Sequence, residues 1–283
     1  MIKTFFFRYF SYAFIALDIL LLPILFSKTE YGEFEFIRAI IGLSPYILLG
    51  SFSGYLYYKY SEGSDFYNEL LMGGMIIAGS ISLIYSLYRQ NFTYFSPLIC
   101  FPLSVIIEKR FQVLRQFTLS FIFKPLLSII IVILAFSKIF SLNIIIIFSY
   151  PIALILWIII GYFFVGNEIF PSKLFSYRLF STYKTLINKG FLINVSTILL
   201  AIFSFYDRYI VSKYFSYLLP SFSLAYNFAQ IIYVGIGTIS LIYTIQIGEN
   251  IRNLDKAAII ELQKKSILIY FVLNIFVFIS YAL

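Results

Sequence analysis

The sequence predicts an all-α polytopic membrane protein, and two observations carry this prediction. Nine apolar runs, separated by short polar turns, fill nearly the whole chain of 283 residues, of which 61% are hydrophobic and only 12% charged. Globular domains carry about 25% charged residues. Runs of about 18 to 25 apolar residues match the helix length that crosses about 30 Å of hydrocarbon, where a helix satisfies its own backbone. We therefore expect about nine transmembrane helices.

The expected spans follow the apolar runs in order. They cover residues 4–26, 34–58, 69–88, 92–107, 117–136, 142–165, 190–211, 222–247 and 266–283. The fourth is the shortest and contains Pro97 and Pro102. The first continues without a small-residue cleavage site, which predicts a retained span instead of a signal peptide.

Lys and Arg predict the orientation of these spans. A cytoplasmic N-terminus leaves four basic residues in the outside loops, Lys28, Arg89, Lys138 and Lys213. The inside loops and helix ends then hold fourteen, namely Lys3, Arg8, Lys59, Lys109, Arg110, Arg115, Lys173, Arg178, Lys184, Lys189, Arg252, Lys256, Lys264 and Lys265. Because basic residues favour the cytoplasmic side, we expect a multi-pass protein of the cytoplasmic membrane with a cytoplasmic N-terminus. The net charge of +8 then reflects topology and attraction to membrane lipids, and no nucleic-acid partner is expected.

The longest polar interruption divides the chain. Residues 166–189 place apolar side chains near helical spacing with basic residues between them, which predicts an amphipathic linker helix on the cytoplasmic surface. The expected organisation is a six-helix lobe at 1–165, this linker, and a partial second lobe of three helices at 190–283. Asp18 precedes the turn at 31–34 by about the distance at which Asp207 precedes the turn at 219–222, which suggests parallel repeats. Chance placement of two aspartates is the alternative.

Composition excludes several kinds of site. The chain has one cysteine, Cys100, and no histidine. An internal disulfide and a thiolate metal site are therefore excluded, and the commonest general base and metal ligand are missing. We expect no metal, no cofactor and no catalytic residue. This weighs against a membrane hydrolase or acyltransferase.

Two stretches carry a resemblance to a known family. The turn KTEYGEF at residues 28–34 is followed by Gly42, Gly50 and Gly54, and FYDRYIV at 205–211 is followed after a loop by FSLAYN at 222–227. In these stretches the chain resembles the polysaccharide and O-antigen flippases of the multidrug/oligosaccharidyl-lipid/polysaccharide exporter superfamily. The resemblance implies two lobes of six helices, so that the second lobe is expected to be incomplete here. It also implies translocation of an undecaprenyl-diphosphate-linked oligosaccharide across the bacterial cytoplasmic membrane by alternating access.

Polar residues within the spans are the candidate site residues. A charge near the bilayer centre costs about 2.5 to 3.5 kcal/mol on insertion scales, so it is expected where water or a partner meets it. Asp18 and Asp207 are candidates for ion coupling or charge balance, and the resemblance implies cation coupling for Asp18. Candidates for substrate binding are Arg38, Lys124, Arg208, Asn194 and Gln230. Each also has a plain structural reading, as a snorkelling anchor, a buried ion pair or an interhelical hydrogen bond.

Three functions stay open from the sequence. The first is the flippase, with membrane lipids and a lipid-linked oligosaccharide as partners and other membrane proteins of polysaccharide assembly as further candidates. The second is a polymerase or glycosyltransferase that would use carboxylates of the first outer loop, Glu30, Glu33 and Glu35. The third is a cation-coupled small-molecule exporter of the same fold. Cationic residues outnumber aspartates inside the expected spans, and this favours the flippase.

Overall fold

In the computed structural model every regular element of the described chain is a helix. The structure describes residues 2–49, 67–170, 191–227 and 246–282, together with Ser181 and Lys184. The helices are α1 (Ile2–Leu25), α2 (Lys28–Leu49), α4 (Tyr67–Arg89), α5 (Phe95–Val113), α6 (Phe117–Ser120), α7 (Phe123–Phe136), α8 (Leu142–Val165), α10 (Phe191–Tyr214) and α12 (Lys256–Ala282). Short 3-10 helices lie at Phe92–Tyr94, Gly166–Ile169 and Ser216–Leu218. Residues 219–227 and 246–252 are also helical.

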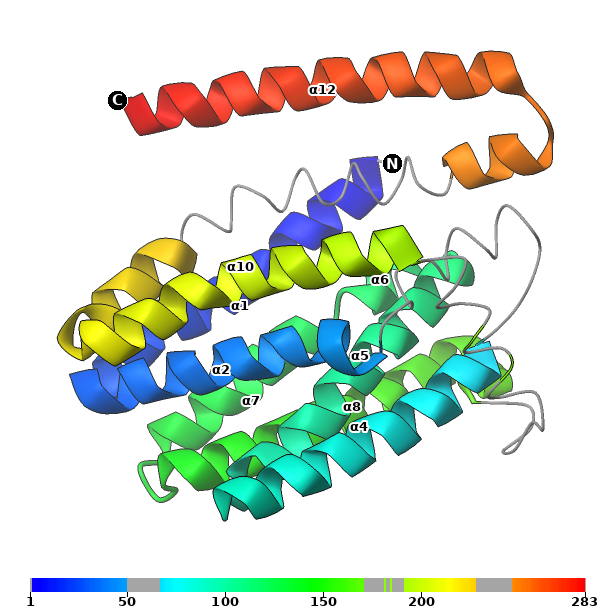
Figure 1. Ribbon diagram of the computed structural model, residues 1–283. Coiled ribbons are helices and arrows are strands. Elements are labelled where there is room, and N and C mark those ends of the chain that lie inside the picture. The colour runs from blue at the N-terminus through cyan, green and yellow to red at the C-terminus, as the bar shows by residue number, and fades with distance from the viewer. Residues whose placement is uncertain are drawn as a thin grey trace.

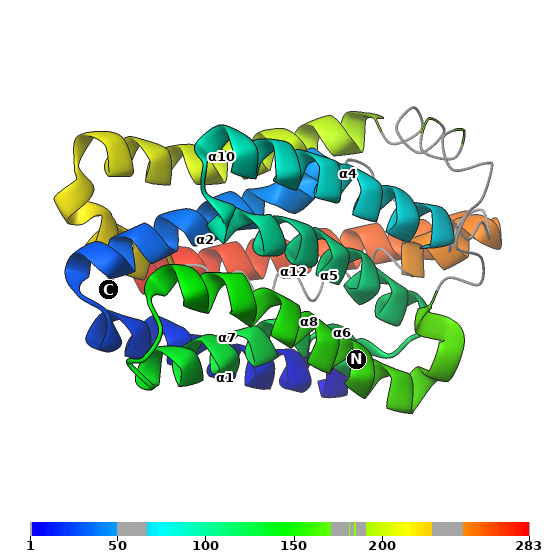
Figure 2. The ribbon, with the colours of Figure 1, turned by 90° about the horizontal axis from the view of Figure 1, so that it is seen from below.

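The long helices from α1 to α10 form a bundle in which neighbours along the chain run in opposite directions, and α12 lies apart from it (Figure 1). Helix α7 packs between α1 and α8, and α5 packs against α4, α8 and α2. Helix α10 lies along α2. Seen from below, the same alternation holds, and the chain turns at opposite ends of the bundle in succession (Figure 2). One end carries the short connections after α1 and α7, and the other carries the N-terminus.

The exposed surface of the bundle is apolar. Three helical segments are long and apolar enough to cross a membrane, Tyr67–Arg89, Phe92–Val113 and Leu142–Ile169, and they correspond to the third, fourth and sixth expected spans. Shorter apolar helices cover Phe10–Leu25 and Phe123–Phe136. Large apolar side chains on the outside include Ile84 and Phe163, which are 65% and 80% exposed. Helices of this length and composition, with large apolar side chains exposed on them, suit lipid and not water, so the chain is a membrane protein.

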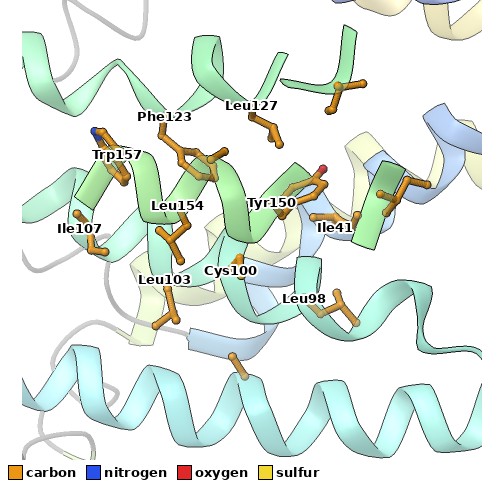
Figure 3. Close-up of a cluster of buried hydrophobic side chains, with 14 of the residues drawn as sticks. Ile41, Leu98, Cys100, Leu103, Ile107, Phe123, Leu127, Tyr150, Leu154 and Trp157 are labelled. Atoms are coloured by element: carbon orange, nitrogen blue, oxygen red, sulfur yellow. The ribbon is translucent and has the colours of Figure 1, made fainter. Parts of the chain in front are cut away.

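The core is formed by α5, α7 and α8 together with buried side chains of α2 and α4 (Figure 3). Trp157 is completely buried, with the rings of Phe111 and Phe123 each 5.3 Å from its own. Its Nε1 donates a hydrogen bond of 2.7 Å to the carbonyl oxygen of Leu119. That bond satisfies the polar end of a large aromatic side chain inside the bundle.

The expected fifth span is interrupted, and a proline explains where. Residues 117–136 form α6 and α7 with a break at Phe121 and Ile122. Pro125 has no N–H with which to bond the carbonyl of Phe121, four residues earlier. The chain tightens there into bonds from Phe121 N to Thr118 O and from Ile122 N to Leu119 O, both 3.3 Å. Pro125 therefore places Lys124 in the first turn of α7.

Two expected helix starts were wrong. Residues 28–33 were expected to form a turn, but α2 begins at Lys28 because Ser27 and Glu30 form a capping box. The Glu30 carboxylate accepts from Ser27 N at 2.9 Å, and Glu30 N donates to Ser27 Oγ at 3.3 Å. Helix α12 begins at Lys256, ten residues before the expected start, with Asp255 Oδ1 accepting from Ala258 N at 3.0 Å. Charged residues there extend a helix beyond its apolar run.

Some expectations fall outside the described residues. These are most of the amphipathic linker at 166–189, most of the eighth span at 222–247, the glycines at 50 and 54, and Gln230. Of the linker, the structure describes the 3-10 helix Gly166–Ile169, Phe170, Ser181 and Lys184.

Candidate functional site

A cavity of about 670 Å³ lies within the bundle. Residues of α1, α2, α5, α7, α8 and α10 line it, as do Tyr226 and Asn227. Among the residues that the structure describes, the charged lining consists of four cations, Arg38, Lys109, Lys124 and Arg208, and one carboxylate, Glu108. A volume in the range of about 300 to 1,000 Å³ is typical of ligand pockets. Polar and charged groups therefore surround a ligand-sized space inside an apolar protein.

Asp18 is fully buried, with 0% exposure, and is held by two other helices. Its Oδ2 lies 3.0 Å from Nη2 of Arg38 on α2 and accepts a 2.9 Å hydrogen bond from Ser128 Oγ on α7. Its Oδ1 has no hydrogen-bond partner among the described residues. The arrangement combines the two structural readings of Asp18, an ion pair and an interhelical hydrogen bond, and it balances the charge of Arg38.

Glu35, which the sequence predicts in an outer loop, is a residue of this site. It lies in α2, also with 0% exposure. Oε1 is 3.3 Å from Arg38 Nη1, and Oε2 accepts a 3.0 Å hydrogen bond from Asn227 Nδ2. The i, i+3 spacing to Arg38 was a signal for this pair. The apolar run starts at residue 34, so Glu35 lies at its boundary, and composition alone does not distinguish it from a loop residue.

Arg208 closes the network from the second part of the chain. It is 7% exposed, and its Nη1 lies 3.9 Å from Glu35 Oε2. Its Nη2 donates to Asn227 Oδ1 at 3.0 Å, and its guanidinium stands 4.4 Å over the ring of Tyr226. Asp207 is exposed. Adjacent residues of a helix point to different sides, so Arg208 faces the cavity and Asp207 does not join this network.

The two parts of the chain also touch near the start of α2. A Cβ placed on Gly32 would lie 3.4 Å from Pro220 Cγ and 3.7 Å from Leu219 Cδ2. The two segments that suggested a repeat, both helical in the structure, therefore lie against each other. Asp18 and Asp207 have different surroundings, one buried and one exposed, and the repeat itself stays a prediction.

Lys124 lies one turn further inward along α7. It is four residues from Ser128, about 6 Å along the helix, and is exposed to the cavity. It forms no hydrogen bond or ion pair with any described residue. On α5, Lys109 Nζ donates to Gln112 Oε1 at 3.2 Å, and Gln112 Nε2 donates to Glu108 Oε1 at 3.0 Å. Lys124 is therefore the one lysine of the cavity lining without such a contact in the described chain.

Of the remaining candidates, Asn194 lies in α10, and its side chain is outside what the structure describes. The described residues contain no group of three or more acidic, Cys or His side chains that could hold a metal ion. The cavity thus brings Arg38, Lys124 and Arg208 to one space, with Asp18 behind Arg38.

Comparison with known proteins gives no match: no family model, no curated protein and no solved structure is similar to this chain. The family resemblance carried by the stretches at 28–34 and 205–227 therefore stays a prediction. The site is interpreted from its own geometry.

Proposed function

We propose that the protein translocates an undecaprenyl-diphosphate-linked oligosaccharide across the bacterial cytoplasmic membrane for surface polysaccharide assembly. One observation carries the proposal: four cationic side chains and one carboxylate line a single cavity inside an apolar helical bundle. A diphosphate that leaves the headgroup region loses its hydration, and fixed cations offset that loss. Hydroxyl, amide and aromatic groups of the same lining suit sugars.

The distribution of carboxylates supports a lipid diphosphate over a cationic small molecule. Asp18 and Glu35 are both fully buried and both paired with Arg38, so neither offers a free carboxylate to the cavity. A cationic drug would need acidic groups in the lining, and Glu108 is the one carboxylate that the described residues contribute to it. The charge of the lining therefore favours an anionic ligand.

The arrangement of the two parts of the chain supports alternating access. In this conformation the outer ends are in contact at Gly32 and Pro220, and Asn227 and Arg208 meet Glu35 just inside them. At the other end, Arg115 and Glu249 form an exposed ion pair of 2.5 Å. Transport would require rupture of the outer contacts. We further propose nine crossings with a cytoplasmic N-terminus. The alternating directions of the helices from α1 to α10 support successive crossings (Figure 1), and the asymmetry of Lys and Arg supports the orientation.

The carboxylates expected in the first outer loop give little support to a polymerase or glycosyltransferase with its catalytic site there. Glu30 caps α2, and Glu35 belongs to the buried network. Glu33 is exposed. A catalytic pair in that loop would therefore lack two of its three candidate carboxylates.

The test is complementation of a strain whose surface glycan depends on this protein. Lys124→Ala should reduce surface glycan while the lipid-linked precursor accumulates, with normal membrane abundance of the variant. Arg38→Ala should also reduce surface glycan, and its abundance should fall because Asp18 is left buried without its cation. Arg38→Lys should retain less activity than Lys124→Arg, because Arg38 contacts Asp18 and Glu35 through two different nitrogens and a lysine does not reproduce that fork. The matched control is Lys28→Ala, an exposed lysine at the start of α2, which should act as wild type. Full glycan display by the Arg38→Ala/Lys124→Ala double variant contradicts the proposal.

A further inference from the structure

An ion pair joins the two parts of the chain at the end of the bundle that carries the N-terminus (Figure 1). Nη2 of Arg115, in the turn after α5, lies 2.5 Å from Oε1 of Glu249, in the helical segment 246–252. The two residues are 134 positions apart, so the contact depends on how the second part lies against the first. Glu108 and Lys109 of the cavity lining lie near the end of α5, and Arg115 follows them in the chain. The pair therefore lies just beyond this end of the cavity.

Arg115 occupies a backbone position that suits glycine. Its φ is +59°, and its N–H donates to Gln112 O at 3.1 Å. The next N–H, of Gln116, donates to Phe111 O at 2.8 Å. These two bonds form the Schellman motif, whose left-handed residue is usually Gly because a Cβ is strained there. A glycine would keep both bonds and remove the strain, so the contribution specific to arginine is its side chain.

The turn after α4, at the opposite end of the bundle, has the same backbone conformation with an uncharged residue. Gln90 has a φ of +50°, and its N–H donates to Leu87 O at 3.2 Å. The N–H of Asn91 donates to Ser86 O at 3.1 Å. Gln90 is exposed, and its amide carries no charge with which to form an ion pair. A comparison of the two turns therefore separates the effect of backbone strain from the effect of the arginine side chain.

The connections between the two parts differ in their exposure to water. Near the start of α2, Glu35 meets Arg208 and Asn227, and Glu35 and Arg208 are 0% and 7% exposed. The side chains of Arg115 and Glu249 are 69% and 38% exposed. Salt screens exposed charges much more than buried ones. A rise in ionic strength therefore weakens the Arg115–Glu249 pair and leaves the buried contacts nearly unchanged.

We propose that the Arg115–Glu249 pair is a salt-sensitive latch that holds the cavity closed at the end of the bundle that carries the N-terminus. Rupture of the pair frees segment 246–252 to move away from the turn after α5 and opens the cavity beside Lys109. An exposed pair contributes a factor of about two to five to a two-state equilibrium, which biases the closed state and still permits opening. The inference rests on the proposed function, because it requires two conformations that open the cavity at opposite ends.

The experiment measures the separation of the two parts at this end by double electron–electron resonance on the full chain in nanodiscs. Spin labels are attached at Thr118→Cys and Asn253→Cys, two exposed positions that flank the pair. The background is Cys100→Ala, because Cys100 is the one cysteine of the chain. The measured quantity is the ratio of the populations with long and short distances between the labels.

The variants are Arg115→Gly, Glu249→Gln and the exchange Arg115→Glu/Glu249→Arg, with Gln90→Gly as the matched control. Arg115→Gly and Glu249→Gln should each raise the ratio about two- to fivefold, as expected for loss of an exposed pair. Gln90→Gly should leave the ratio unchanged, and the exchange should restore most of the wild-type value. A rise in salt from about 0.01 M to about 1 M, which shortens the screening length from about 30 Å to about 3 Å, should raise the ratio in wild type and not in Arg115→Gly.

Several outcomes would overturn the latch. These are a ratio at or below the wild-type value in either single variant, an equal rise in Gln90→Gly, and an exchange variant as open as the single variants. Because Arg115→Gly relieves backbone strain, its Tm should equal or exceed that of wild type. A lower Tm with an unchanged ratio would assign the pair to stability of the fold and also overturn the latch. The expected shift in ratio, together with full glycan display by the Arg38→Ala/Lys124→Ala double variant, would count against the proposed transport alone.

Discussion

The ion pair between Asp18 and Arg38 predicts a large energetic coupling between two helices. Asp18 is completely buried, with Arg38 3.0 Å and Ser128 2.9 Å from its Oδ2. Arg38→Met would leave the carboxylate with Ser128 as its one hydrogen-bond partner in the described chain, and breaking a buried pair in this way costs about 3–5 kcal/mol. Asp18→Asn should cost less, because Arg38 keeps Glu35 at 3.3 Å and its side chain is 28% exposed. We expect about 1–2 kcal/mol for that change, between the values for exposed and buried pairs.

The double variant removes both charges and should be more stable than the sum of the single losses indicates. We expect a coupling free energy of about 1–3 kcal/mol, the range for residues in one ionic network. The assay is unfolding by titration with SDS in mixed micelles. The reporter is the fluorescence of Trp157, the one tryptophan of the chain, which is completely buried in the core.

The matched control is the exposed pair of Glu261 and Lys265 on α12, whose atoms are 2.6 Å apart and whose side chains are 66% and 59% exposed. An exposed i, i+4 pair should couple by about 0.3–0.5 kcal/mol. A coupling between Asp18 and Arg38 no larger than that of the control would refute the reasoning. It would mean that the two groups reach water through the cavity and gain little from each other.

Three further predictions can be tested on the same protein. Reporter fusions after Lys109 and Lys184 should be cytoplasmic and one after Lys138 external, and the reverse pattern would contradict the orientation. Gly161→Ala should destabilise the protein by about 1–3 kcal/mol in the SDS assay, because a Cβ there overlaps the Phe111 ring. Gly79→Ala is its control, since a Cβ there meets nothing within 4 Å, and it should stabilise by up to about 1 kcal/mol. Equal effects of the two substitutions would contradict this packing. Ser27→Ala should cost about 1 kcal/mol. Hydrogen bonds from Ser27 hold the pKa of Glu30 below its ordinary value, so this stabilisation is present above that ordinary pKa and is lost as pH falls through the folded one. An unchanged acid sensitivity in Ser27→Ala would show that the cap does not contribute.

Parts of the site could be predicted from the sequence because a charge in an apolar run is conspicuous. Asp18, Arg38, Lys124 and Arg208 were selected on that basis, and three of them line the cavity while the fourth binds Arg38. Glu35 was missed because it lies near the end of its run, where a charge is ordinary. From the sequence, Lys109 contributes only to the positive charge expected on the cytoplasmic side. Its place in the cavity depends on which face of α5 turns inward.

The positions at which α2 and α12 begin differ from the predicted spans for a local reason. Ser27 and Glu30 have the spacing of a capping box, which predicts the start of α2. The polar composition of 28–33 instead predicts a turn, and the structure shows that the capping box is the better indicator. The break before Lys124 follows from Pro125 alone, since a missing N–H is a local property. For the positions where these helices begin and break, local hydrogen-bonding patterns are therefore better predictors than the length of an apolar run.

By itself the sequence determined that the described chain is helical and belongs in a membrane. Run length and the internal hydrogen bonding of a helix are local properties, which need no knowledge of neighbouring helices. Only the tertiary structure decided which charges neutralise one another. Asp18, Glu35, Arg38 and Arg208 lie up to 190 residues apart, and their pairing depends on the rotation and depth of α1, α2 and α10. The same packing leaves Lys124 without a partner in the described chain, because an ion pair requires atoms within about 4 Å and sequence spacing does not fix distances between helices.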